Sequence, residues 1–235
     1  DDARALVAEM DGYPTMFAVH ENHPYRPWFQ QVMSLHREGF FGVPRLLRFD
    51  QYDATEPPEV YKNEAALGVL IEYGTHLVDM ALTLLGTPSR TYARLHRINP
   101  RTKGETMALV VYEYPETTVA IDIGWKPGGL ARGGFVLEGD RGAVLYEGTM
   151  ARGASSRFRV TQGETVVVDE TRSPYDDYVE SFYRLEREFT DCMLEGRQPF
   201  QSGRRNLRTL AATFAAYEAA ARGEVLALDA FLSAA

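Results

Sequence analysis

The chain has 235 residues, 45% of them hydrophobic and 25% charged, which is typical of a globular protein and supplies enough apolar material for one large domain or two small ones. Its 25 Lys and Arg residues against 33 Asp and Glu residues give a formal charge of -8, so a small-molecule substrate is expected and nucleic acid and membrane partners are not. A single cysteine, with no secretion signal and no long apolar run, predicts a cytoplasmic protein without an intrachain disulfide.

The first residues have the pattern of a helix followed by a strand. Leu6, Val7 and Met10 have the spacing of apolar residues on one helix face, and residues 15–19 are a short apolar run typical of a buried strand. No initiator Met precedes the helical pattern. We therefore expect the chain to begin within a longer protein, in preference to a tag or a processed terminus.

The next segment predicts two helices with a strand between them. Pro27 is well placed as the first residue of a helix that ends at Gly39. Residues 45–52 alternate as in a strand. A long helix then runs to about Leu85 and ends at Gly86.

Residues 90–170 change to a period of two with short connections, which indicates an antiparallel meander. The clearest strands are 106–112, 118–123, 134–138 and 165–168. Two helices close the chain, one from Ser173 to Gly196 and one from Ser202 to Gly223. This order predicts an α+β fold with one open, mostly antiparallel sheet covered on one face by helices.

The other face of this sheet needs a partner. Tyr112, Tyr114 and Trp125 lie near strand ends and are expected to make that face apolar. We therefore predict a homo-oligomer that forms through the open sheet face.

The most informative stretch is 68–79, where three titratable residues interrupt an apolar segment. Glu72 and His76 are four residues apart and Asp79 follows three later, so on a helix their side chains stand one above another. Burying such groups is unfavourable unless they are paired. A sequence that keeps them in apolar surroundings therefore usually builds a site.

His76 is the strongest candidate for catalysis. An imidazole titrates near neutral pH and can act as a general acid or base, and Glu72, one helical turn earlier, can orient it. The alternative is a core histidine that only satisfies a hydrogen bond. Gly68 and Gly74 allow a ligand to approach the helix closely, which favours the functional interpretation. For Asp79 we prefer a structural role, as a hydrogen-bond acceptor for a neighbouring loop.

A metal site is a further interpretation of this motif. Glu72, His76 and Asp79 offer nitrogen and oxygen ligands, and His20 and His23 add another pair. No additional ligand follows at a spacing characteristic of metal sites. We therefore expect no metal.

Substrate contacts are expected from the loop of residues 20–26, which directly follows a buried strand, and from one strand end in the sheet. Polar loop side chains suit a polyol or a carboxylate, with simple solvation of the loop as an equal alternative. A tryptophan–lysine pair at the strand end is a candidate for the same pocket, and its alternative is an anchor in the sheet. The candidate binding residues are Asn22, Arg26, Trp125 and Lys126.

Four short motifs follow one another along the chain. They are Glu21-Asn22 followed by Pro27-Trp28, the segment 37–44 (Arg-Glu-Gly-Phe-Phe-Gly-Val-Pro), Glu72-x-Gly74-x-His76-x-x-Asp79, and Gly196-Arg-Gln-Pro199. Each alone is weak, but in this order and spacing they resemble the C-terminal two thirds of the glucose-fructose oxidoreductase and inositol dehydrogenase (Gfo/Idh/MocA) family. The resemblance covers nearly every residue.

The resemblance implies a two-domain NAD(P)-dependent oxidoreductase that acts on a sugar, cyclitol or related hydroxyl compound. Residues 1–26 would be the last helix and strand of its dinucleotide-binding domain. Residues 27–235 would be its substrate-binding and oligomerisation domain, with a fold like that of the glyceraldehyde-3-phosphate dehydrogenase C-terminal domain. His76 would transfer the hydroxyl proton while Glu72 holds its imidazole. The family's open sheet implies a dimer or a tetramer.

The chain departs from the family pattern in three respects. Glu72 stands where aspartate is most frequent, and Pro24 stands where an arginine is common, with Arg26 next to Pro27. No Gly-x-Gly-x-x-Gly follows a strand, and no Glu-Lys-Pro is present. We therefore expect NAD or NADP to act in the intact enzyme and no cofactor to bind this chain alone, which by itself should be inactive.

A rival interpretation is a non-catalytic sugar-binding or scaffold protein with the same sheet fold, and a metal-dependent lyase or isomerase is a third. The sequence upstream of the first residue would separate the enzyme from the binding protein. Elemental analysis would test the third interpretation.

Overall fold

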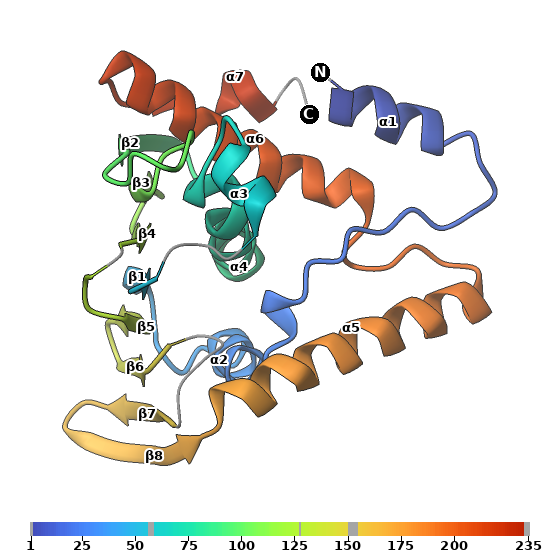
Figure 1. Ribbon diagram of the computed structural model, residues 1–235. Coiled ribbons are helices and arrows are strands. Elements are labelled where there is room, and N and C mark those ends of the chain that lie inside the picture. The colour runs from blue at the N-terminus through green and yellow to red at the C-terminus, as the bar shows by residue number, and fades with distance from the viewer. Residues whose placement is uncertain (1, 56–58, 127, 150–154, 233–235) are drawn as a thin grey trace.

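One mixed sheet carries the fold (Figure 1). The computed structural model describes residues 2–55, 59–126, 128–149 and 155–232. Within them the sheet has nine strands in the order β8-β7-β6-β5-β1-β4-β3-β2-β9. The strands are β1 (Pro44–Asp53), β2 (Arg90–His96), β3 (Met107–Glu113), β4 (Thr118–Trp125), β5 (Arg132–Gly139), β6 (Gly142–Glu147), β7 (Ser156–Gln162), β8 (Thr165–Arg172) and β9 (Leu226–Ala227).

Strand β1 interrupts the antiparallel meander. It lies between β4 and β5, parallel to β4 and antiparallel to β5, whereas the other neighbouring strands pair antiparallel. The parallel pair places Phe49 beside Ile121, and both side chains are fully buried. The predicted open and mostly antiparallel sheet is therefore confirmed, with one parallel pair that the sequence did not indicate.

The helices are α1 (Asp2–Met10), α2 (Pro27–Arg37), α3 (Val60–Glu64), α4 (Thr75–Leu85), α5 (Pro174–Glu195), α6 (Gly203–Arg222) and α7 (Asp229–Leu232), with a 3-10 turn η1 (His23–Tyr25) and a π-helical turn η2 (Leu70–Gly74). The side chains of Ser173 and Ser202 begin α5 and α6 by accepting a backbone N–H three residues later, at 3.2 Å and 3.3 Å. Both helices end at a glycine in the left-handed region. The two predicted C-terminal helices are thus confirmed. Within the described residues, no helix is long and apolar enough to cross a membrane.

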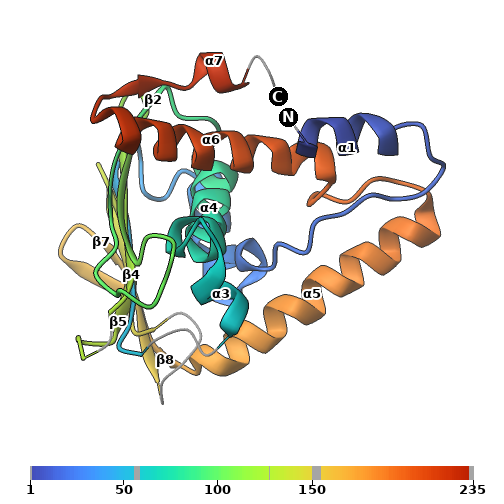
Figure 2. The same cartoon turned by 45° about the horizontal axis from the view of Figure 1, so that its top comes forward.

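Helices α2, α4 and α6 cover one face of the sheet (Figures 1 and 2). The core lies between these layers. The Trp28 and Phe29 rings of α2 lie 5.3 Å and 6.1 Å from that of Phe135 on β5. Fully buried alanines, Ala212 and Ala216, face the core from α6. Helix α5 runs away from the sheet toward α1, as Figure 2 shows.

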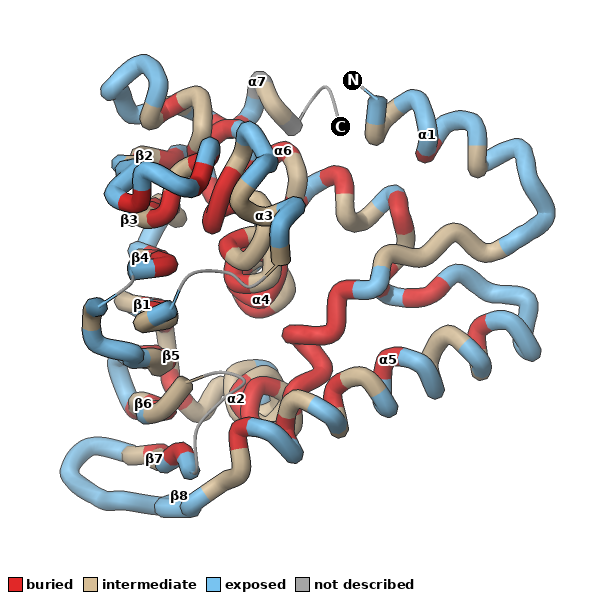
Figure 3. Tube along the Cα trace, viewed as in Figure 1, coloured by how far each residue is buried: buried red, intermediate tan, exposed pale blue. Residues whose placement is uncertain are grey.

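The loop of residues 20–26 lies between α4 and α5 and is buried from residue 21 onward (Figure 3). Glu21 and Asn22 expose only 5% and 3% of their surface. Asn22 Nδ2 donates to Ser181 Oγ of α5 at 2.7 Å. The loop is therefore held inside the protein, where its polar side chains need partners from the protein itself.

The three aromatic residues expected on the open sheet face lie on the covered face instead. Tyr112 is 1% exposed and donates its hydroxyl to the Ala212 carbonyl of α6 at 3.1 Å. Tyr114 has the same parity as Tyr112 and packs against the core, and Trp125 is part of the core. The prediction for these residues is wrong, because a period of two gives Tyr112 the direction of the buried Val110.

Charged pairs stand on the open face in their place. Arg48 contacts Asp50 at 2.9 Å, and Arg132 contacts Asp122 at 3.0 Å. The Arg132 guanidinium also lies 3.8 Å from the centre of the Tyr52 ring. The open face thus carries charged pairs at its centre, with the Tyr52 ring covered by Arg132.

Residues 15–19 do not form the predicted strand. Ala18 makes an isolated bridge to Ser202, and Val19 N donates to the Gln201 carbonyl at 2.8 Å. The prediction is wrong because an extended segment becomes a regular strand only with a ladder of partners, and the described residues supply this segment with a single bridge.

Candidate active site

The helix that carries the motif opens with the π-helical turn η2 and continues as α4. The carboxylate of Glu105 fixes this turn by accepting the backbone N–H groups of Gly68 and Leu70, both at 2.9 Å, and the Tyr217 hydroxyl at 2.6 Å. A Cβ atom at Gly68 would lie 1.8 Å from the Glu105 carbonyl oxygen, so only glycine fits there. Single π-helical turns occur frequently at functional sites.

His76 stands at the start of α4 and is held by a carboxylate from the loop. Its Nδ1 lies 2.7 Å and 2.8 Å from the two carboxylate oxygens of Glu21. A carboxylate can only accept, so Nδ1 carries the proton. Within the described residues Nε2 has no hydrogen-bond partner, and the side chain is 27% exposed. The imidazole is therefore fixed at one nitrogen and free at the other.

A second imidazole stacks on the first. The His23 ring lies 4.1 Å from the His76 ring, centre to centre, at an angle of 15°. Its Nε2 lies 3.1 Å from Nη2 of the fully buried Arg26. A guanidinium only donates, so His23 accepts at Nε2 and carries its proton on Nδ1, which faces Glu21 Oε1 at 3.6 Å.

Burial, together with the neighbouring His76 and Arg26 side chains, holds the pKa of His23 well below its usual range. His23 is therefore neutral at physiological pH. Burial alone would raise the pKa of Glu21, but its interactions with His76 and His23 outweigh burial and hold that pKa well below the usual range. The cluster thus contains an ionised carboxylate, a neutral imidazole and a guanidinium.

Tyr73 of η2 closes the cluster from one side. Its ring lies edge-on to His23 and His76, at 5.8 Å and 5.9 Å between centres. The hydroxyl is buried and has no hydrogen-bond partner in the described part of the chain, and burial raises its pKa. A buried hydroxyl of this kind can donate to a bound molecule or to water.

Glu21, His23 and His76 also bring possible metal-ligand atoms within 4.8 Å of one another. Each imidazole lone pair lies in its own ring plane, however, and the two ring planes are nearly parallel and stacked. An ion bound to both rings would lie out of at least one plane. This geometry disfavours a shared metal. His20, the other candidate ligand, contacts Glu186 at 2.5 Å.

The Glu72 carboxylate does not contact the His76 imidazole in the described structure. Its carboxylate contacts Lys62 Nζ at 2.9 Å and the Tyr61 hydroxyl at 3.4 Å, and its side chain is 33% exposed. The contact with His76 that was expected from the four-residue spacing is made by Glu21 instead. A catalytic role of Glu72 stays a prediction.

Asp79 is fully buried and accepts three side-chain hydrogen bonds. The donors are Gln201 at 2.8 Å, Arg205 at 2.5 Å and Thr209 at 2.8 Å. These contacts tie α4 to α6 and to the turn before it, as a structural acceptor would.

The candidate binding residues fall into two groups. Asn22 and Arg26 are buried, and their polar groups contact the protein rather than a surface pocket. Trp125 is 7% exposed, and the exposed Lys126 donates its backbone N–H to the Asp53 carbonyl at 2.9 Å. Within the described residues no hydrogen bond, ion pair or ring contact joins the second group to His76. Substrate binding by all four stays a prediction.

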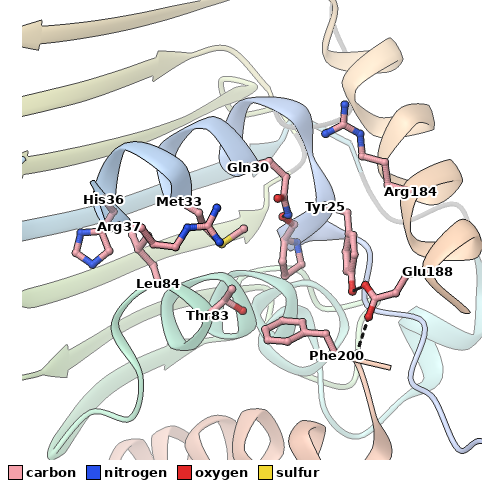
Figure 4. Close-up of a pocket in the computed structure, with 11 residues that line it drawn as sticks. Tyr25, Gln30, Met33, His36, Arg37, Thr83, Leu84, Arg184, Glu188 and Phe200 are labelled. Atoms are coloured by element: carbon pink, nitrogen blue, oxygen red, sulfur yellow. Dashed lines mark hydrogen bonds between the residues drawn. The ribbon is translucent and has the colours of Figure 1, made fainter. Parts of the chain in front are cut away.

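A separate cavity of about 390 Å³ lies between α2, α4 and α5. Figure 4 shows Gln30 and Arg37 of α2 on one side and Arg184 and Glu188 of α5 on the other. None of Glu21, His23 or His76 lines it. The cavity is thus distinct from the imidazole cluster.

Residues 29–145 match the model of the GFO/IDH/MocA C-terminal domain. The chain belongs to the GFO/IDH/MocA family. It is 26% identical over 242 residues to a D-apiose dehydrogenase from Rhizobium rhizogenes, covering 98% of this chain and 70% of that one. It is 30% identical over 252 residues to a D-apiose dehydrogenase from Paraburkholderia graminis, covering 97% of this chain and 63% of that one.

A solved oxidoreductase structure has the same architecture. The crystal structure of an oxidoreductase from Agrobacterium radiobacter, in complex with NAD+, L-tartaric acid and magnesium, is 25% identical. The two structures superpose with a TM-score of 0.83, and the match covers 97% of this chain and 70% of the Agrobacterium radiobacter chain. The family and the fold predicted from the sequence are therefore confirmed.

Glu21 belongs to one of the family-like motifs, but it was not among the site residues predicted from the sequence. The available signal was its position, since a carboxylate directly after an apolar segment and next to other polar residues is often buried with a partner. That signal does not name the partner, which lies 55 residues away.

Proposed function

We propose that this chain is the substrate-binding part of an NAD(P)-dependent oxidoreductase that oxidises a hydroxyl group of a sugar, a cyclitol or a related compound. The observation that carries the proposal is His76, which is fixed at Nδ1 by Glu21 and has no partner at Nε2 among the described residues. Support for the substrate class comes from the relatives, which are named as dehydrogenases of the sugar D-apiose.

In this proposal His76 moves the hydroxyl proton. Neutral Nε2 accepts the proton from the substrate oxygen while the hydride leaves the adjoining carbon, so that the C–H and O–H bonds break and a C=O double bond forms. Bound NAD(P) supplies the acceptor for that hydride. In the reverse direction the protonated imidazole returns the proton to the carbonyl oxygen. The exposed part of the His76 side chain allows a substrate to reach it.

The residues present do not fit a dinucleotide site. No strand is followed by a glycine-rich turn of the Gly-x-Gly-x-x-Gly type in this sequence. We therefore propose that this chain by itself neither binds NAD(P) nor turns over. Calorimetric titration with NAD should show no heat of binding, and micromolar binding would contradict this part of the proposal.

We further propose that the protein is a cytoplasmic homo-oligomer, a dimer or a tetramer, that assembles through the open sheet face. Charge pairs such as Arg48–Asp50 lie there together with the exposed Leu109 of β3, a mixture suited to self-complementary contacts. Size exclusion with light scattering should give a mass of two or four chains.

The test of the proposed reaction is His76→Gln in the intact enzyme. Loss of a general base should lower kcat by about 10²- to 10⁴-fold, while calorimetry should still detect substrate binding. Undiminished turnover would remove His76 from the reaction. Sugar binding without any redox turnover in the wild-type intact protein would instead support a non-catalytic sugar-binding protein.

A further inference from the structure

We propose that Glu21 is the positioning residue of His76 and that Glu72 is not. Glu21 sets which imidazole nitrogen faces the substrate, because its carboxylate accepts the hydrogen bond from Nδ1–H and leaves Nε2 for proton transfer. The catalytic consequence rests on the proposed function, whereas the positioning itself does not.

The contact between the two residues is close and two-fold. Both carboxylate oxygens of Glu21 lie within 2.8 Å of His76 Nδ1. A hydrogen bond at one ring nitrogen fixes the tautomer and leaves the other nitrogen with a lone pair. A carboxylate that orients a histidine in this way also stabilises the imidazolium that forms when the histidine accepts a proton.

Glu21 is itself held in place. Its Oε1 accepts the backbone N–H of His23 at 3.2 Å, and the side chain is 6% exposed. The stacked His23 ring covers the pair from one side, and its Nδ1 faces the same oxygen at 3.6 Å. A buried carboxylate with these neighbours has little freedom to rotate away from His76.

Arg26 fixes the orientation of the stacked His23 ring. The guanidinium is completely buried and approaches His23 Nε2 at 3.1 Å. Because Arg26 donates to Nε2 of His23, the His23 proton lies on the side of Glu21. The contact with Arg26 therefore points the Nδ1–H of His23 toward the Glu21 carboxylate.

Glu72 does not have this geometry. Lys62 contacts its carboxylate at 2.9 Å, and a third of its side chain is exposed to solvent. The two glutamates therefore form a matched pair for mutation, since each can be changed in the same way and only one is in contact with His76.

The first experiment uses nitrogen NMR of the His76 ring in this chain, assigned with His76→Gln. At a pH high enough for the ring to be neutral, the wild type should carry the proton on Nδ1. Glu21→Ala should shift the ring to the form with the proton on Nε2, which a free histidine side chain prefers, whereas Glu72→Ala should keep the proton on Nδ1. Retention of the Nδ1 proton in Glu21→Ala, or its loss in Glu72→Ala, would overturn the proposal.

The second experiment uses Glu21→Gln. This variant keeps the shape of the side chain, so it remains informative even if Glu21→Ala does not fold. In the intact enzyme kcat should fall about 10- to 100-fold, as for other residues that orient a catalytic group, with KM little changed. The acid limb of the pH profile should move to lower pH, because the imidazolium loses its negative neighbour while His23, Arg26 and Tyr73 remain. An unmoved acid limb would contradict the proposal.

The two proposals can fail separately. If His76→Gln keeps full turnover, the proposed function fails, and the NMR experiment still decides whether Glu21 orients His76. If His76→Gln abolishes turnover but Glu21→Ala leaves the Nδ1 proton in place, only the positioning role is wrong.

Discussion

His76 Nδ1 lies 2.7 Å from a carboxylate oxygen of Glu21, a residue 55 positions earlier in the chain. The contact joins the first turn of α4 to a loop that is buried between α4 and α5. It gives the GFO/IDH/MocA domain an imidazole with one nitrogen fixed and the other without a partner in the described part of the chain.

Glu21→Gln should destabilise the chain at neutral pH and much less in acid. Burial raises the pKa of Glu21, but His76 and His23 lower it further, so the folded value lies below the usual 4.5. The stability from this depressed pKa is present above pH 4.5 and is lost as pH falls below it. Urea unfolding should give a difference of about 1–3 kcal/mol at pH 7, and a difference that stays constant down to pH 3 would contradict the assignment.

The buried His23 should make the free energy of unfolding depend on pH in a second, separate way. The folded protein keeps His23 neutral because of burial and its positive neighbours, whereas the unfolded chain takes up a proton near pH 6.5. Lowering the pH below 6.5 therefore favours unfolding, by up to about 1.4 kcal/mol per pH unit for one such group. His23→Gln should flatten this slope between pH 6.5 and pH 5. An equally steep slope in the variant would show that other groups cause it.

Gly68→Ala should destabilise the π-helical turn, because the new Cβ would lie 1.8 Å from the Glu105 carbonyl oxygen. We expect a loss of more than about 2 kcal/mol in urea unfolding, as for other forced overpacking. Gly12→Ala is the control, since its Cβ would make an ordinary contact at 3.4 Å with the Glu9 carbonyl. Equal stability of the two variants would mean that the clash is relieved without cost.

Asp79→Asn should weaken the junction of α4 and α6. It removes the negative partner of Arg205 at a fully buried position, and breaking a buried ion pair typically costs about 3–5 kcal/mol. Asp169→Asn serves as the control, because the Asp169–Arg157 pair is exposed and such pairs contribute little. Similar melting temperatures for both variants would argue against a structural role for Asp79.

Local pattern selected His76 as a candidate and predicted the two C-terminal helices and the antiparallel strands, because helix spacing, caps and a period of two depend on near neighbours in the chain. It did not find the parallel pairing of Phe49 with Ile121 or the contact of Glu21 with His76. Both join segments that only the complete fold brings together. The helical spacing predicted that Glu72 orients the His76 imidazole, but the Glu72 carboxylate contacts Lys62 instead.

The period of two along β3 decides the face on which Tyr112 lies. Tyr112 follows Val110 by two residues and therefore shares its face of β3. A position near the end of a strand does not change that direction. The oligomer stays a prediction, and it now depends on a face with charged pairs rather than on exposed tyrosines.

The most direct test of the central claim is a double-mutant cycle of Glu21→Gln and His76→Gln, read as kcat/KM for sugar oxidation by the intact enzyme. If Glu21 acts through His76, the double variant should be no slower than His76→Gln alone, because the positioning residue has nothing left to position. Glu72→Gln combined with His76→Gln completes the comparison. If the losses from Glu21→Gln and His76→Gln multiply in the double variant, Glu21 acts independently of His76 and the account is contradicted.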